Sequence, residues 1–187
     1  LFPDHPDAET WRRAIRLYTV DYLAALARRN SFGIVPHGFF ARTDPGGNRR
    51  IGAYWYRYFM PPGSGGSWWV GVNANLAAAG VGLVRAARIL NDPSLRSVAQ
   101  SQLDWILGCN PFDASTVVGI GRNHPPQFVN GSEFYPPTPL LPGAVMNGLG
   151  GTAEDQPFVG DGIYHVSEYW TPMVSYTMWL LALLQKE

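Results

Sequence analysis

The sequence is poor in charge and contains a single cysteine, and each shortage excludes a class of protein. Charged residues make up 15% of the 187 residues, and 14 Lys and Arg balance 14 Asp and Glu. A chain without net positive charge lacks the electrostatic attraction behind non-specific nucleic-acid binding and membrane-surface binding. Cys109 alone forms neither an intrachain disulfide nor a thiolate zinc cage. Because no apolar run reaches the ~20 residues that span a bilayer, we expect neither a nucleic-acid nor a membrane partner.

Aromatic residues, glycine and proline are abundant instead. The chain has 7 Trp, 9 Tyr and 9 Phe, together with 21 Gly and 16 Pro. This apolar content is enough to bury a core, so we expect a folded, loop-rich chain and not a disordered one. At ~150 residues per domain, the length fits one domain. The chain starts at Leu1 without an initiator methionine or a leader pattern, and we expect it to be part of a longer gene product.

Apolar residues at spacings of three and four predict four helices. They cover approximately residues 7–29, 73–90, 92–108 and 171–185. Asp92 as N-cap and Pro93 in the first helical position mark the start of the third helix most clearly. In the first helix, the same spacing places Tyr18 and Tyr22 on the buried face. The residues between the helices contain most of the prolines and glycines and form long loops.

This pattern predicts an all-α fold. The turn between the second and third helices is so short that the two must be antiparallel neighbours. A helical hairpin that alternates with long loops indicates a toroid or barrel whose loops gather on one face. An (α/α)6 barrel has more helices than this chain, so isolated residues 1–187 would leave helix faces exposed. We therefore expect the rest of the barrel to lie elsewhere in the gene product or on another chain.

Glu168 is the carboxylate best suited to acid–base chemistry. It lies immediately before the last predicted helix, among Tyr164, His165, Tyr169 and Trp170. Aromatic neighbours remove water from a carboxyl group, which raises its pKa and keeps it protonated near neutrality. A protonated carboxyl group can donate a proton to a leaving glycosidic oxygen. The spacing leaves open that Glu168 caps helix amides or pairs with an arginine.

Tryptophans in the loops are candidates for sugar binding, because the flat C–H faces of sugars pack on aromatic rings. The candidates are Trp55, Trp68, Trp69 and Trp170. Each of them also fits an interior position, where most tryptophans lie. No two histidines have the i, i+4 spacing of a metal-binding helix, so we expect no metal site in this segment.

Several motifs follow one another in a recognisable order. They are Trp69-Val-Gly-Val-Asn73, Ala99-Gln-Ser-Gln-Leu-Asp-Trp-Ile-Leu-Gly-Cys-Asn-Pro-Phe112, Ser115-Thr-Val-Val-Gly-Ile-Gly121, Leu141-Pro-Gly-Ala-Val145 and Ser167-Glu168. In this order they closely resemble the C-terminal third of the catalytic domain of glycoside hydrolase family nine. The resemblance covers roughly residues 68–185.

The resemblance implies that residues 1–187 are the C-terminal part of an (α/α)6 catalytic domain that hydrolyses β-linked glycosidic bonds with inversion. It implies that Glu168 is the general acid and that the general base lies in an N-terminal half absent from this segment. The residues then expected to line sugar subsites are Trp69, Arg122, His124, Asp155, Asp161, Tyr164 and Trp170. The implied substrate is a polysaccharide or oligosaccharide. The implied location is extracellular or periplasmic, with no cofactor in this segment and calcium bound, if at all, elsewhere in the full enzyme.

Two stretches depart from the family pattern. The family has a His-His-Arg element after a proline pair, whereas here Arg122 and His124 come before Pro125 and Pro126. The family's Asp-Tyr-Asn-Ala after the acid is replaced by Thr171-Pro-Met-Val-Ser-Tyr176. These departures predict a divergent branch with a different oligosaccharide substrate. They also leave two alternatives open: a non-catalytic carbohydrate-binding or scaffold module derived from such an enzyme, and a helical interaction domain.

Overall fold

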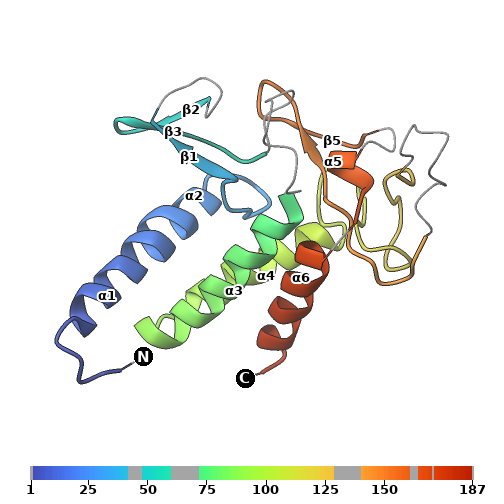
Figure 1. Cartoon of the computed structure of the whole chain (residues 1–187). Helices are drawn as coiled ribbons and strands as arrows, with labels where there is room; N and C mark the ends of the chain where they lie inside the picture. Colours follow the sequence, from blue (N-terminus) through green and yellow to red (C-terminus); the bar gives the residue numbers. More distant parts are fainter. Residues whose placement is uncertain are drawn as a thin grey trace.

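Long helices lie side by side in the computed structural model (Figure 1). The structure describes residues 2–41, 48–59, 72–128, 140–160, 164–169 and 171–186, with Tyr164 and His165 described in their backbone alone. The predicted helices are present within one or two residues of their expected bounds, which is the usual uncertainty of a helix end.

The first helix contains a wider turn in its middle. α1 (Ala8–Arg16) continues into the π-helical segment η1 (Leu17–Ala24) and then into α2 (Ala25–Ala27). A π-helix closes its hydrogen bonds over five residues, so the buried face no longer recurs at spacings of three and four. The prediction that Tyr18 lies on the buried face is therefore wrong. Tyr18 is 56% exposed, whereas Leu23 is buried.

α3 (Val72–Leu90) is the central helix and packs most extensively against α4 (Ser94–Ile106) and α6 (Thr171–Leu184). The short turn makes α3 and α4 antiparallel, as predicted. The Asp92 carboxylate accepts the backbone N–H of Ser94 at 3.1 Å, which satisfies an N–H at the start of α4. The close contact of α3 with α6 depends on Gly80, which leaves room for Leu180.

The core lies between these helices. Leu76 and Leu83 of α3, Leu95 and Ile106 of α4, and Leu180 of α6 are all 1% exposed or less. Full burial of such a side chain contributes about 1.5–3 kcal/mol. The core therefore holds the helices together and supports the loops at their ends.

Short strands occur in the loops, so the all-α prediction is correct only for the scaffold. β1 (Gly38–Phe40), β2 (Arg49–Ile51) and β3 (Tyr54–Arg57) form an antiparallel sheet in the order β1-β3-β2. β4 (Gly150–Gly151) pairs with β5 (Pro157–Phe158). The sheet contains Trp55, a candidate sugar platform, which is half-buried and pairs with Phe40 across β1 and β3.

The strands, the described parts of the connecting loops and the short helix α5 (Tyr164–Ser167) gather at one end of the helices, and the two termini lie at the other end (Figure 1). α3 and α6 both begin at the loop-bearing end. Glu168 lies there too, between α5 and α6.

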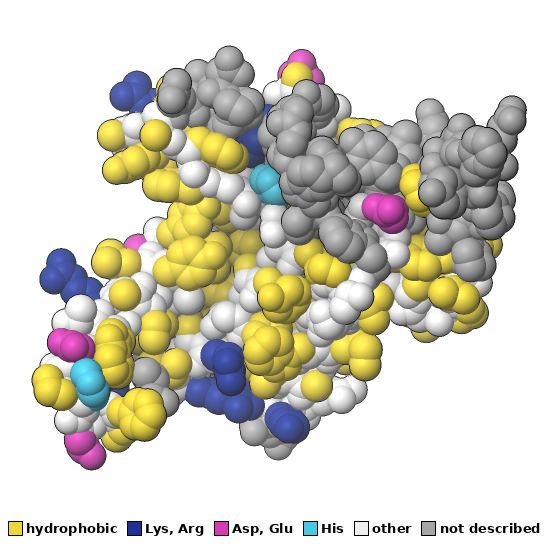
Figure 2. Space-filling model, viewed as in Figure 1, with side chains coloured by type: hydrophobic (Ala, Val, Ile, Leu, Met, Phe, Trp, Pro, Cys, Tyr) yellow, Lys and Arg dark blue, Asp and Glu magenta, His cyan; other side chains and the backbone are white. Residues whose placement is uncertain are grey.

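Apolar side chains remain exposed on the helices, as expected for an incomplete barrel. Figure 2 shows hydrophobic side chains over the helical half of the molecule. The most exposed on η1 and α6 are Leu17, Tyr18, Met178, Trp179 and Leu181, at 43% to 65%. Across the described part of the chain, no helix combines the length and the apolarity needed to cross a bilayer.

Candidate functional site

Three segments lie next to one another, and Glu168 belongs to the third of them. The middle segment, residues 144–148, pairs on one side with residues 116–118, where the N–H of Val118 donates to the Ala144 carbonyl at 2.9 Å. On its other side it pairs with residues 166–169, where the N–H of Asn147 donates to the Glu168 carbonyl at 2.7 Å. The backbone of Glu168 is thereby held at a defined place at the start of α6.

Asn73, in the first turn of α3, holds the middle segment. Its backbone N–H donates to the Asn147 carbonyl at 2.9 Å. Its side-chain Nδ2 donates to the Met146 carbonyl at 3.0 Å and to Thr116 Oγ1 at 2.7 Å. Asn73 is fully buried. The first turn of the central helix and the segment beside Glu168 therefore form one connected hydrogen-bonded unit.

The Glu168 side chain is partly buried. Burial raises the pKa of its carboxyl group above the ordinary value, and a hydrogen bond with the Asn147 side chain acts in the opposite direction. Desolvation disfavours the charged form of a carboxyl group, so more of Glu168 is protonated near neutrality than for an exposed glutamate. A carboxyl group in this condition can act as a proton donor.

Buried polar atoms without hydrogen-bond partners occur in residues next to Glu168 in the chain or connected to it by hydrogen bonds. Among the residues that the structure describes, Ser167 Oγ, Tyr169 Oη and Asn73 Oδ1 are buried and have no hydrogen-bond partner. Ser167 and Tyr169 are the sequence neighbours of Glu168, and Asn73 is connected to it through Asn147. Because buried polar groups are normally paired, this region has unused hydrogen-bonding capacity for a ligand, for water or for a further part of the protein.

Arg122 and His124 lie in the exposed loop that follows residues 116–118. Arg122 Nε donates to the Asp113 carboxylate at 2.5 Å. His124 Nδ1 donates to the carbonyl of Ser115 at 2.9 Å, which fixes the orientation of the imidazole ring. The loop is connected to Glu168 through the three paired segments.

The remaining predicted subsite residues are described less fully. Trp69, Asp161 and Trp170 lie outside the described residues. Tyr164 is the first residue of α5 and is described in its backbone alone. Their sugar contacts stay predictions.

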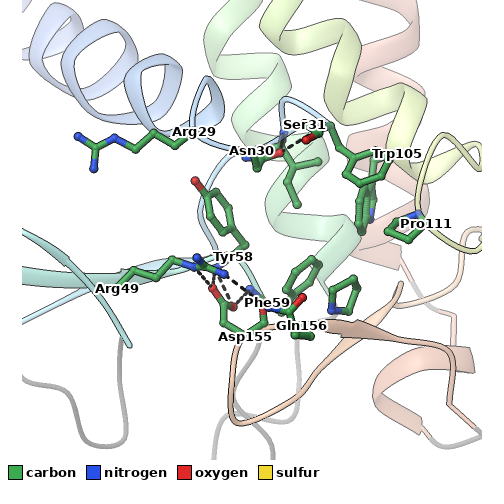
Figure 3. A pocket seen from close by; sticks show the side chains of 13 residues that line it. Arg29, Asn30, Ser31, Arg49, Tyr58, Phe59, Trp105, Pro111, Asp155 and Gln156 are labelled. Carbon is green, nitrogen blue, oxygen red and sulfur yellow. Dashed lines mark hydrogen bonds and ion pairs between the residues drawn. The ribbon is translucent and has the colours of Figure 1, made fainter.

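Asp155 has a structural environment that differs from the one expected. Its side chain is fully buried and accepts hydrogen bonds from the backbone N–H groups of Tyr58 and Phe59, both at 3.0 Å. Arg49 Nε donates to it at 2.8 Å (Figure 3). Arg57 Nε lies 3.7 Å from Asp155 Oδ1. No surface of this carboxylate is available to a sugar. Asp155 instead connects the β4–β5 turn to the end of β3.

A pocket of about 250 Å³ lies beside this ion pair (Figure 3). Tyr58, Phe59 and Trp105 form apolar walls, and Arg29 and Gln156 contribute polar groups. Of the described residues that line it, none belongs to the three paired segments that include Glu168.

The structure also brings together aromatic rings that the sequence analysis did not connect. Tyr18, Tyr22, Phe39 and Tyr54 form a continuous strip, with successive ring centroids 5.8, 5.0 and 4.9 Å apart. Apart from Tyr22, the rings are exposed. No sequence signal predicts this strip, because two rings come from η1 and two come from strands of the loop region.

A second pocket, of about 240 Å³, lies next to Tyr18 and Tyr22. It contains His37 and Asn75, whose Nδ1 and Nδ2 atoms are 2.8 Å apart. Burial, with a smaller contribution from the Arg57 charge, lowers the pKa of His37 to about 4. His37 is therefore neutral at physiological pH and can accept the Asn75 hydrogen bond.

Metal ligands do not cluster in the part of the chain that the structure covers. Within those residues, no group of three or more His, Cys, Asp or Glu side chains is arranged to hold a metal ion. Calcium binding stays a prediction about the complete enzyme.

Comparison with known proteins gives a family and two related structures. The model of the family described as glycosyl hydrolase family 9 matches residues 52–171. No curated protein matches the chain. Two solved structures of the cellulase Cel9M of C. cellulolyticum are similar to 62% of this chain, both with a TM-score of 0.46. The structure in complex with cellobiose is 26% identical and the other 27% identical, and the chain covers 28% of the length of each.

Proposed function

The chain belongs to glycosyl hydrolase family 9, and we propose that it forms the C-terminal part of an (α/α)6 barrel that hydrolyses β-linked glycosidic bonds. The matched residues 52–171 make up more than half of the chain and include Glu168. Parallel and antiparallel helices with their loops at one end, and exposed apolar side chains on η1 and α6, support membership of a larger helical barrel. The rest of the barrel comes from the same gene product or from another chain.

Glu168 is the general acid in this proposal. The observation that carries the assignment is its environment: a partly buried carboxyl group, with a raised pKa, at the loop-bearing start of α6. Its O–H donates a proton to the leaving glycosidic oxygen as the C–O bond breaks. Inversion requires a second carboxylate that activates a water on the opposite face of the sugar, ~6.5–9.5 Å from the first. We assign that base to the part of the enzyme outside this chain.

The sugar subsites are proposed to include six residues of the loops around Glu168 in the sequence motifs. They are Trp69, Arg122, His124, Asp161, Tyr164 and Trp170. The pairing of residues 116–118 with residues 144–148 supports Arg122 and His124, because it connects their loop to the segment beside Glu168. Asp155 is omitted because its carboxylate is enclosed by its own ion pairs.

The substrate is a polysaccharide or oligosaccharide, and the proposed location is extracellular or periplasmic. Both follow from family membership. Any calcium site of the complete enzyme is assigned to residues outside this chain.

Replacement of the acid tests the proposal. In the complete enzyme, Glu168→Gln removes the proton donor while keeping the size of the side chain, so kcat should fall by about 10²–10⁴-fold. Sugar binding, measured by calorimetry, should remain nearly unchanged. Glu154→Gln is the matched control, because Glu154 is an exposed glutamate in the β4–β5 turn, and its turnover should equal that of the wild type.

Equal turnover in wild type and Glu168→Gln would contradict the assignment of the acid. A wild-type enzyme that binds sugars but releases no reducing ends would instead support the non-catalytic carbohydrate-binding module.

A further inference from the structure

Asn147 contacts Glu168 through both its backbone and its side chain. Its backbone N–H donates to the Glu168 carbonyl at 2.7 Å. Its side-chain amide hydrogen-bonds the Glu168 carboxyl group. Asn147 is fully buried. Two contacts with one residue restrict both the position of the Glu168 backbone and the direction of its side chain.

Asn147 is itself held on both sides. Its carbonyl accepts the N–H of Asn73 from α3, and the neighbouring Gly148 N–H donates to the Val166 carbonyl at 3.0 Å. The Asn73 side chain holds the preceding residue, Met146, through its carbonyl. A polar group orients its partner effectively when its own position is fixed by packing and hydrogen bonds, and Asn147 meets that condition.

We propose that Asn147 is the positioning residue of Glu168, orienting its carboxyl group for proton donation and stabilising the carboxylate that remains. The proposal rests on the proposed role of Glu168 as general acid. An amide N–H can donate to the acceptor oxygen of the protonated carboxyl group, which leaves the O–H to face the leaving group. When the proton passes to the glycosidic oxygen, Glu168 becomes a carboxylate, and the same N–H then donates to a charged acceptor.

A hydrogen bond to a charged acceptor is stronger than one to a neutral acceptor. The contact therefore becomes stronger as the proton leaves, which is the property required of a group that assists proton donation. Because the hydrogen bond favours the charged form of Glu168, the Asn147 contact lowers the Glu168 pKa, whereas burial raises it. Burial has the larger effect on this carboxyl group, and the Asn147 hydrogen bond opposes it.

A pH titration of the wild-type chain tests the contact directly. In isotope-labelled protein, the side-chain amide signals of Asn147 should shift with the same midpoint as the carboxyl carbon signal of Glu168. Asn110 provides the internal control, since it is a buried asparagine whose Nδ2 donates to the carbonyls of Trp105 and Ala114. Its amide signals should not follow that midpoint.

Two substitutions in the complete enzyme test the role in catalysis. Asn147→Leu keeps the approximate size and removes the N–H donor, so the pKa of Glu168 should rise. Asn147→Asp replaces the donor with a second carboxyl group, whose negative charge raises the Glu168 pKa further. The alkaline limb of the kcat/KM profile, where the acid loses its proton, should then move to higher pH. Misorientation of the acid should lower kcat by up to about 100-fold, with little change in KM. Asn110→Asp, as the control, should leave the alkaline limb in place.

The outcomes separate this inference from the proposed function. The positioning role is overturned if the Asn147 amide signals do not shift when Glu168 ionises. It is also overturned if the Asn147 variants keep the alkaline limb of the wild type. Full turnover in Glu168→Gln overturns the function of Glu168 whatever the titration gives. Because the titration uses the wild-type chain, its answer does not depend on whether the Asn147 variants fold.

Discussion

The role of a carboxyl group in this molecule depends on the groups that surround it. Glu168 is partly buried with an amide partner, whereas Asp155 is fully buried between two arginines. Burial raises the pKa of the Glu168 carboxyl group, whereas ion pairs and backbone N–H groups enclose the Asp155 carboxylate. On the proposed function the first donates a proton, and the second holds the β4–β5 turn against the end of β3.

Asp155→Asn tests this structural role. The substitution leaves Arg57 buried without its countercharge, so the free energy of unfolding should fall by about 3 kcal/mol. Denaturant unfolding measures the change. Asp113→Asn removes a carboxylate from an ion pair whose partner, Arg122, is exposed, and should change stability by less than about 1 kcal/mol. Equal losses in the two variants would contradict the distinction between a buried and an exposed pair.

At the scale of elements, the position of α6 depends on how closely it approaches α3. A Cβ atom on Gly80 would lie 2.7 Å from Leu180 Cδ2 and 2.9 Å from its Cδ1. Leu180 is fully buried, so its side chain has little room to move. Gly82, one half-turn further along α3, has no atom within 4 Å of the corresponding position. Glu168 lies directly before α6, so this contact also contributes to the position of the proposed acid.

Substitution of each glycine by alanine tests this contact, with Gly82 as the control for Gly80. Gly80→Ala should destabilise the fold by about 1–2 kcal/mol, because overpacking costs more than the gain in helix propensity. Gly82→Ala should stabilise it by up to about 1 kcal/mol, because only the gain in helix propensity remains. Urea unfolding of both variants provides the measurement. If the free energy of unfolding changed with the same sign in both variants, α6 would not pack tightly against α3 at Gly80.

At the scale of the whole molecule, η1 and α6 both expose large apolar side chains. Large exposed apolar patches mark surfaces that are covered by another structure. On the proposed function, that structure is the remainder of the (α/α)6 barrel. The same side chains should then have opposite effects on the isolated chain and on the complete enzyme.

Substitution of Met178 and Leu181 by Gln tests this expectation. In the isolated chain, the double variant should bind less of a hydrophobic dye, because both side chains are exposed on α6. In the complete enzyme, it should lower the free energy of unfolding by roughly 2–5 kcal/mol, because both side chains become buried. Ile120→Gln, in an exposed loop, should change neither quantity appreciably. An unchanged stability of the complete enzyme would show that α6 stays exposed there.

Helix positions and family membership were predictable from the sequence. The spacing of apolar residues predicts α3 and α4, and Asp92 and Pro93 mark the start of α4. These signals are local, so they can be recognised without knowledge of the fold. The motif series predicted the family because its residues lie in order along the chain. The wider turn at η1 was not predicted, since the pattern that reveals an α-helix assumes α-helical geometry throughout.

The partners of the carboxylates were decided by the tertiary structure alone. Arg49 and Asp155 are 106 residues apart in the chain, and nothing local to either residue indicates that they meet. The contacts of Asn147, and the strip of Tyr18, Tyr22, Phe39 and Tyr54, depend in the same way on segments that fold together from distant positions. The sequence by itself determined which chemical groups are present and which helices carry them. Burial and pairing, which set a group's charge and direction, arise only when remote segments pack together.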